Sequence, residues 1–226
     1  MHESQLGRVY PCVKRVVFGL VALAAPTFAG DLDDVAAGIE FHYNRLAGMR
    51  LDFEQEISYA GRRKTLERGT LALLRPGRMR WDYSKPPGKL LVSDGDWLRM
   101  YNPYANQVQT VRIEESEDLR APLSFLLGRL RLKRQFRDLR LEAIDGESAL
   151  VGRGRTGAEA YDRVEFYFDP EAYRLNKLRV FGRDGAITEF RFSNEELNPP
   201  LRPEQFEFHA PAGAEILPEI DLEESR

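Results

Sequence analysis

The residues of this chain that could support catalysis are few, and their spacing does not suit it. Downstream of residue 29 the histidines are His42 and His209, and neither lies in the His-x-x-x-His or His-Glu-x-x-His spacing of a zinc site. The Gly-x-Ser-x-Gly sequence, which marks the nucleophile of many hydrolases, does not occur. We therefore predict no catalytic residue and no metal site, and we expect each histidine at the surface or between helices.

One glycine pattern has the spacing of a nucleotide-binding loop. Gly152-Arg-Gly154-Arg-Thr-Gly157 matches the glycines of dinucleotide sites. Such a loop needs a helix directly after it, because the helix N-terminus binds the pyrophosphate, but Ala160–Phe168 is typical of a strand. A hairpin loop is predicted instead, so neither a cofactor nor an enzymatic activity is expected.

Binding of apolar groups is the chemistry that the sequence favours. Apolar and aromatic residues alternate with polar ones from Leu71 to Tyr83, and Leu91–Gly95 and Tyr101–Tyr104 follow closely. These segments are typical of consecutive antiparallel strands with one apolar face. The sequence therefore predicts an apolar trough.

The first 29 residues are typical of an export signal. Lys14 and Arg15 precede the apolar run Val16–Ala25, and small residues at Thr27 and Ala29 predict cleavage after Ala29. The apolar run is short for a transmembrane helix, so an uncleaved anchor is the less favoured alternative. We expect a soluble periplasmic protein.

Cysteine chemistry is excluded from the mature chain. Cys12 is the single cysteine and lies before the apolar run, so it would leave with the signal. The mature chain then has no disulfide, no thiolate and no site for a lipid anchor.

Charge and length bound the remaining possibilities. Without residues 1–29 the chain has 30 basic and 35 acidic side chains, a net charge of −5 with neutral histidines, which argues against nucleic-acid binding. No Pro/Gly/Ser-rich linker divides the chain, so residues 30–217 are predicted to form one domain, followed by an acidic C-terminal tail at 218–226.

The predicted elements begin with a helix over 32–46, capped by Asp31 and ended by Gly48. About eleven short strands follow between Leu51 and Phe192, with a further candidate at Phe206–Phe208. Pro122 begins a second helix, whose apolar stripe comprises Leu123, Leu126, Leu127 and Leu130. Two helices cannot form a bundle. The predicted fold is mainly β (α+β), a curved antiparallel sheet with helices packed on or in its concave face.

An ordered set of motifs then resembles a known family. The motifs are Gly69-Thr-Leu71-Ala-Leu-Leu-Arg75-Pro76 leading to Trp81, Leu91-Val92-Ser93-Asp94-Gly95 leading to Tyr101-Asn102-Pro103, Gly182-Arg183-Asp184-Gly185, and Phe206-Glu-Phe208. In this order they resemble the LolA family of periplasmic carriers. The resemblance implies an incomplete β-barrel with a helical lid. It also implies a monomer that takes acylated lipoproteins from an inner-membrane ABC transporter and delivers them to an outer-membrane acceptor.

The resemblance also assigns candidate site residues. Arg75 and Pro76 match the place of an arginine that holds the lid closed in the family, and the stripe from Leu123 to Leu130 matches the lid helix. A solvated arginine at a strand end is the alternative for Arg75, because Arg78 and Arg80 lie nearby. Candidates for the acyl-cavity lining are Phe53, Ile57, Leu71, Leu73, Met79, Trp81 and Tyr83, with ordinary core packing as their alternative.

Alternatives remain for one residue and for the function. Better-known relatives carry an aromatic residue at the position of Met79, so ordinary core packing is the alternative to a part in transfer. A sensor of lipoproteins that regulates a membrane signalling partner, and a general lipid or glycolipid shuttle, are the alternative functions.

Overall fold

Twelve strands form a single open sheet in the computed structural model, which describes residues 31–59, 62–112, 130–156 and 159–218. The strands are β1 (Gly48–Tyr59), β2 (Arg62–Leu74), β3 (Arg78–Lys85), β4 (Leu90–Asp94), β5 (Trp97–Asn102), β6 (Gln107–Arg112), β7 (Phe136–Ile144), β8 (Glu147–Gly154), β9 (Tyr161–Phe168), β10 (Leu175–Gly182), β11 (Ala186–Leu197) and β12 (Glu215–Ile216). Their order in the sheet is β12-β6-β5-β4-β3-β2-β1-β11-β10-β9-β8-β7. The prediction of a mainly β fold is confirmed.

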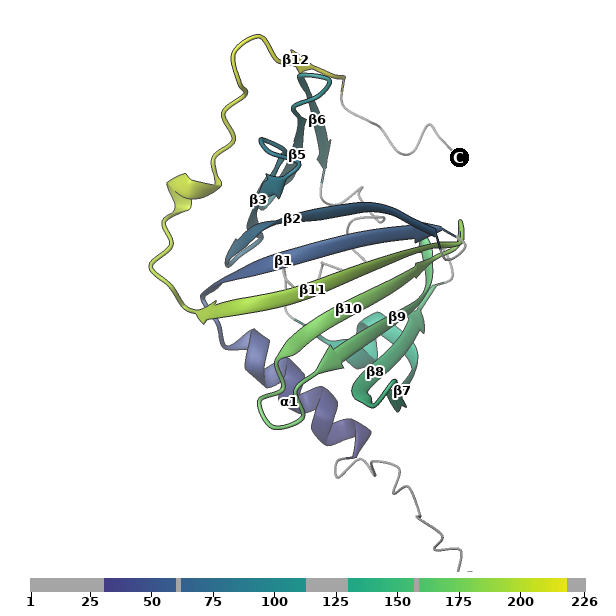
Figure 1. Ribbon diagram of the computed structural model, residues 1–226. Coiled ribbons are helices and arrows are strands. Elements are labelled where there is room, and N and C mark those ends of the chain that lie inside the picture. Colours follow the sequence, from purple (N-terminus) through teal and green to yellow (C-terminus); the bar gives the residue numbers. More distant parts are fainter. Residues whose placement is uncertain (1–30, 60–61, 113–129, 157–158, 219–226) are drawn as a thin grey trace, which may run out of the picture.

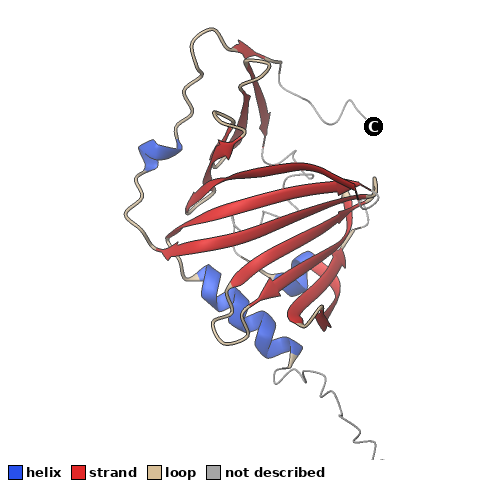
Figure 2. Ribbon diagram, viewed as in Figure 1, coloured by secondary structure: helices blue, strands red, loops and turns tan. Residues whose placement is uncertain are grey.

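The sheet curves without closing into a barrel (Figure 1). Neighbouring strands are antiparallel except β12, which pairs in parallel with β6. The described helices are few (Figure 2): α1 (Leu32–Asn44), the short α3 (Leu132–Gln135) and the 3-10 helix η1 (Pro203–Phe206). The predicted incomplete antiparallel sheet is therefore present, and its two edges are β7 and β12.

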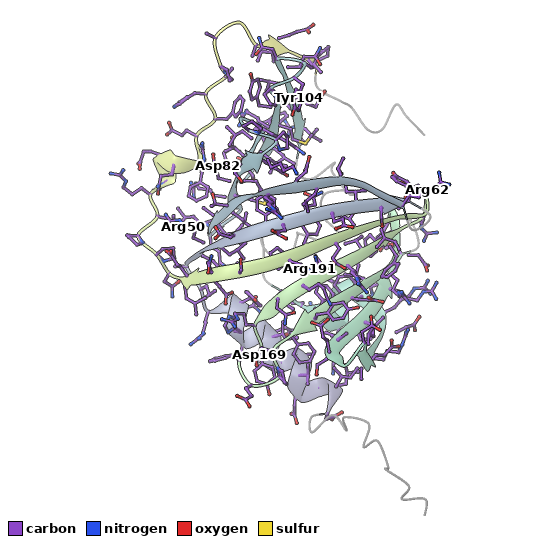
Figure 3. All side chains as sticks on the ribbon, viewed as in Figure 1. Arg50, Arg62, Asp82, Tyr104, Asp169 and Arg191 are labelled. Carbon is purple, nitrogen blue, oxygen red and sulfur yellow. The ribbon has the colours of Figure 1, made fainter. Side chains whose placement is uncertain are left out.

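Apolar and polar side chains alternate along the strands, so one face of the sheet is apolar. Direct cross-strand partners share a face of the sheet, and two aligned rows run Leu51–Leu71–Trp81 and Met49–Leu73–Met79 across β1, β2 and β3. All these side chains are buried and belong to the main core, together with the apolar stripe of α1. We call this the inner face. Charged residues such as Arg50, Asp82 and Arg191, labelled in Figure 3, alternate with it on the outer face.

Two boundaries differ from the sequence prediction. The helix ends at Asn44, with Arg45 as its C-cap, and Gly48 is instead the first residue of β1. A Cβ at Gly48 would lie 2.9 Å from the Leu73 carbonyl oxygen, so the glycine permits close strand approach rather than ending a helix. Phe206 ends η1 and is not in a strand; burial of its ring produces an apolar signal without strand pairing.

Some predictions lie outside the described residues. These are the signal at 1–29, most of the acidic tail and the helix that begins at Pro122 with Leu123, Leu126 and Leu127; Leu130 is described and is buried. The single domain over 30–217 remains a prediction. In the described part of the chain, no helix has the length and hydropathy needed to cross a membrane.

Candidate functional site

An apolar cavity of about 350 Å³ opens on the inner face. It lies toward the end of β1 and the β10–β11 turn, away from α1 (Figure 1). Its apolar and aromatic walls comprise Ile57, Trp81, Tyr83, Leu91, Tyr161, Val180 and Phe190, and Gln55, Tyr59, Asp184 and Thr188 add polar atoms. Small-molecule sites typically have volumes of about 300–1,000 Å³, so this cavity has the size of a ligand site.

Packed aromatic rings make one wall rigid. The Phe53 ring lies edge-on to Trp81, with 4.5 Å between ring centroids, and 5.1 Å from Tyr83. Trp81 also meets Phe190 at 5.9 Å across the sheet. The Trp81 indole Nε1 is buried and has no hydrogen-bond partner among the described residues. A buried donor without an acceptor is energetically costly.

The predicted lining residues divide between this cavity and the core. Ile57, Trp81 and Tyr83 line the cavity, and Phe53 packs behind them. Leu71, Leu73 and Met79 are at most 5% exposed and lie in the core that α1 covers. Contact of any of these residues with a ligand remains a prediction.

Arg75 joins the β2–β3 turn to α1. Its Nη2 donates a hydrogen bond to the Tyr43 carbonyl oxygen at 3.2 Å, and its backbone N–H donates to the Ala47 carbonyl at 2.9 Å. Carbonyl groups at a helix C-terminus lack helical partners and favour cations. Burial lowers the pKa of the Arg75 guanidinium from its usual value. The structure therefore places Arg75 against the last turn of α1, whereas Arg80 pairs with Asp82 on the outer face.

Two polar residues of α1, which sequence reasoning missed, tie the helix to the chain beyond residue 129. The Asn44 side chain forms reciprocal hydrogen bonds with the Leu130 backbone, at 2.9 Å to its oxygen and 2.7 Å from its nitrogen. Glu40 accepts a hydrogen bond from the Leu132 N–H at 2.7 Å. Two polar residues one helical turn apart on α1 could have indicated such contacts. The sequence could not identify their partners, which lie 86 and 92 residues away.

Two buried tyrosines, Tyr43 on α1 and Tyr83 on the cavity wall, have raised pKa values. Burial, and next the nearby Glu195 carboxylate, raises the pKa of Tyr43 well above its usual range, and its hydroxyl accepts a hydrogen bond from Leu175 N–H. Burial, and next Glu67, raises the pKa of Tyr83 in the same direction. Their ionisation is therefore opposed by the folded state.

Tyr161 on the cavity wall is expected to make folding stability sensitive to alkaline pH. Burial, with Glu159 as the second cause, raises its pKa to about 12. The unfolded phenol titrates near 10, so its contribution is complete below about pH 10 and is lost between about pH 10 and 12. Urea unfolding at pH 9 and pH 11.5 should show a smaller loss of stability for Tyr161→Phe than for wild type. An equal loss in both proteins would contradict this assignment.

The structure describes both histidines and the first two glycines of the glycine pattern, Gly152 and Gly154. His42 Nε2 lies 3.6 Å from a Glu195 oxygen at the α1–β11 contact, and His209 is exposed. After Gly154 the next described element is strand β9, as the sequence predicted. Among the residues that the structure describes, no group of three or more His, Cys, Asp or Glu side chains could hold a metal ion.

The family model described as "Outer membrane lipoprotein carrier protein LolA" matches residues 44–209. The chain belongs to the LolA family. The match includes the Arg75–Pro76 turn and the cavity, so the resemblance found in the sequence is confirmed.

Relatives share most of the chain's length. An outer-membrane lipoprotein carrier protein of Dechloromonas aromatica is 31% identical, over 76% of this chain and 81% of its own. One from Methylobacillus flagellatus is 29% identical, over 82% of this chain and 90% of its own. An uncharacterized conserved protein from Thermus thermophilus has a similar fold, with a TM-score of 0.51 at 14% identity over 82% of this chain and 97% of that one.

Proposed function

We propose that this LolA-family protein carries acylated lipoproteins through the periplasm, from the inner to the outer membrane. The observation that carries the proposal is the apolar cavity of about 350 Å³ on the inner face of a chain whose relatives are named outer-membrane lipoprotein carrier proteins. The carrier would hold its cargo noncovalently and would need no catalytic residue or cofactor.

The energetics of an apolar cavity suit a carrier. Transfer of acyl chains from water gains about 0.8 kcal/mol per CH₂ group, so about ten sheltered methylenes would gain on the order of 8 kcal/mol before opening costs. Delivery therefore requires a closed, empty state that offsets part of this gain. Two contacts support such a state: Arg75 bonds to the Tyr43 carbonyl on α1, and Asn44 of α1 bonds to Leu130.

The proposed partners follow from the direction of transport. An inner-membrane ABC transporter would release the lipoprotein to this carrier. It would supply the energy for loading, because the chain has no phosphate-binding loop for nucleotide hydrolysis. An outer-membrane acceptor would then take the acyl chains. Residues 1–29 would direct the chain to the periplasm and be removed after Ala29.

Cargo identification tests the proposed function. The full chain with its own signal would be expressed in a Gram-negative periplasm, purified without detergent and analysed by intact-complex mass spectrometry. Bound acylated lipoprotein is the expected result. Phospholipid or glycolipid alone would overturn it in favour of a general lipid shuttle. An empty protein that also fails to release lipoproteins from spheroplasts would favour the sensor.

Replacement of Arg75 tests its proposed part in closing the cavity. Arg75→Leu removes the guanidinium hydrogen bond to the Tyr43 carbonyl, which should lower the free energy of unfolding by about 1–2 kcal/mol. It should also raise the fluorescence of the apolar dye N-phenyl-1-naphthylamine by at least twofold, because α1 separates from the apolar inner face more readily and exposes it to the dye. Arg78→Leu, in the same turn region, is the control and should change neither value. Equal dye binding by wild type and Arg75→Leu would remove the lid role while leaving the carrier proposal intact.

A further inference from the structure

An ion pair lies beside the apolar cavity on the inner face, between a residue of β2 and the residue before β4, strands that lie on either side of β3. Lys89 Nζ, just before β4, lies 2.7 Å from both carboxylate oxygens of Glu67 on β2. The side chains are 34% and 15% exposed. The pair is thus half-buried, and stability alone gives little reason for it, because exposed ion pairs contribute about 0–1 kcal/mol and buried pairs can often be replaced by apolar residues without loss.

The pair is joined to the cavity wall by direct contacts. Lys89 Nζ lies 4.4 Å from the centroid of the Tyr83 ring, which lines the cavity. Glu67 is the direct cross-strand partner of Gln55, which also lines it. Since partners across strands share a face, Glu67 lies on the inner face next to one cavity-lining residue, and Lys89 lies over another.

The ion pair also lines a second hollow. It has a volume of about 340 Å³, and its walls include Glu67, Lys89, Met100, Gln109 and Leu217. The ion pair therefore lines this hollow and, through the contact of Lys89 with Tyr83, adjoins the wall of the apolar cavity. A ligand with apolar chains in the cavity and polar groups beside the ion pair would match this arrangement.

We propose that the Glu67–Lys89 pair binds the diacylglyceryl end of the cargo, with its acyl chains in the apolar cavity. Lys89 Nζ donates a hydrogen bond to an ester carbonyl oxygen, since an ammonium has three donors and two are directed at Glu67 in this structure. Glu67 is a positioning residue that holds the ammonium beside Tyr83. The peptide that follows the diacylglyceryl group would leave through the second hollow. This inference rests on the proposed carrier function.

Substitution of Lys89 separates this contact from general binding in the cavity. Lys89→Met keeps the length of the side chain and removes its charge. It should weaken binding of a synthetic S-diacylglyceryl-cysteinyl peptide about tenfold, which corresponds to about 1.4 kcal/mol, and leave binding of N-phenyl-1-naphthylamine within twofold. Lys89→Arg should restore lipopeptide binding to within about threefold of wild type, because it retains a cation with N–H donors.

The matched control is Arg68, which follows Glu67 on β2 and has its side chain on the opposite face of the sheet. Arg68 forms an ion pair with Glu54 at 2.8 Å on the outer face, so Arg68→Met removes a cation without touching the cavity. It should bind both probes as wild type does. A phospholipid with the same acyl chains serves as a third probe: weaker binding of it by Lys89→Met places recognition at the shared ester groups, and unchanged binding places it at the cysteinyl end.

The outcomes distinguish the inference from the function it rests on. Unchanged lipopeptide binding by Lys89→Met, or equal loss of lipopeptide and dye, would overturn the head-group contact while the carrier function stands. A wild-type protein that binds the dye and not the lipopeptide would instead overturn the carrier function. Lipopeptide loss with retained dye binding and rescue by Lys89→Arg would support the contact.

Discussion

Replacing Phe206 with alanine is expected to lower the free energy of unfolding by about 3–5 kcal/mol, the usual range for a buried phenylalanine. The Phe206 side chain is 1% exposed, and η1, which it ends, packs on β3 and β4. Arg80 Nη1 donates to the Gln205 carbonyl at 3.2 Å at the same contact. Truncation leaves a cavity under the segment that joins β11 to β12 along the outside of the sheet (Figure 1). Urea unfolding followed by tryptophan fluorescence measures the change.

A second phenylalanine provides the control for Phe206. Phe41 lies on α1 and is 69% exposed, so Phe41→Ala should change the free energy of unfolding by less than about 0.5 kcal/mol. The same loss in both variants would show that the packing of η1 on the sheet is not what stabilises the C-terminal segment.

Replacing Gly69 with alanine is expected to cost about 1–3 kcal/mol of unfolding free energy through overpacking. A Cβ at Gly69 would lie 2.1 Å from the Asp82 carbonyl oxygen and 2.9 Å from Phe53 Cε1. The first contact is with backbone, so β2 and β3 must shift apart. The second contact pushes the Phe53 ring toward Trp81 and the cavity wall, and dye affinity should fall as well.

Gly146 is the matched glycine for this test. It lies in the β7–β8 turn with a φ of 82°, and no atom lies within 4 Å of a Cβ placed there. Asparagine tolerates this left-handed conformation, so Gly146→Asn should change the unfolding free energy by less than about 0.5 kcal/mol. If Gly69→Ala were equally neutral, close approach of β2 and β3 would not be the reason for the glycine.

Prediction from the sequence succeeded where a local pattern decided the structure. Alternating side chains predicted the β strands and the apolar face that carries Phe53, Trp81 and Tyr83. It failed at Gly48, because close packing against another strand favours the same residue type as a helix cap. It failed at Phe206, because a buried ring at the end of a 3-10 helix gives the same apolar signal as a strand.

The local sequence could not decide which of three arginines contacts α1. Arg75, Arg78 and Arg80 lie within six residues, and no property of the segment ranks them. The fold does so, because Arg75 reaches the Tyr43 carbonyl on α1 while Arg80 pairs with Asp82 on the opposite face. The resemblance to the family had selected the same arginine, on motif order rather than on contact.

Residue type, spacing and motif order were enough to predict the strands, their apolar face, the lack of cysteine downstream of Cys12 and the family. Contacts between distant residues depend instead on how the elements pack. Asn44 bonds to Leu130 because α1 packs beside the segment that leads into α3. Glu67 bonds to Lys89 because the pairing and register of β2, β3 and β4 bring them together. A shift of one residue in that register would turn each side chain to the other face, so such contacts are a property of the whole fold and not of any segment.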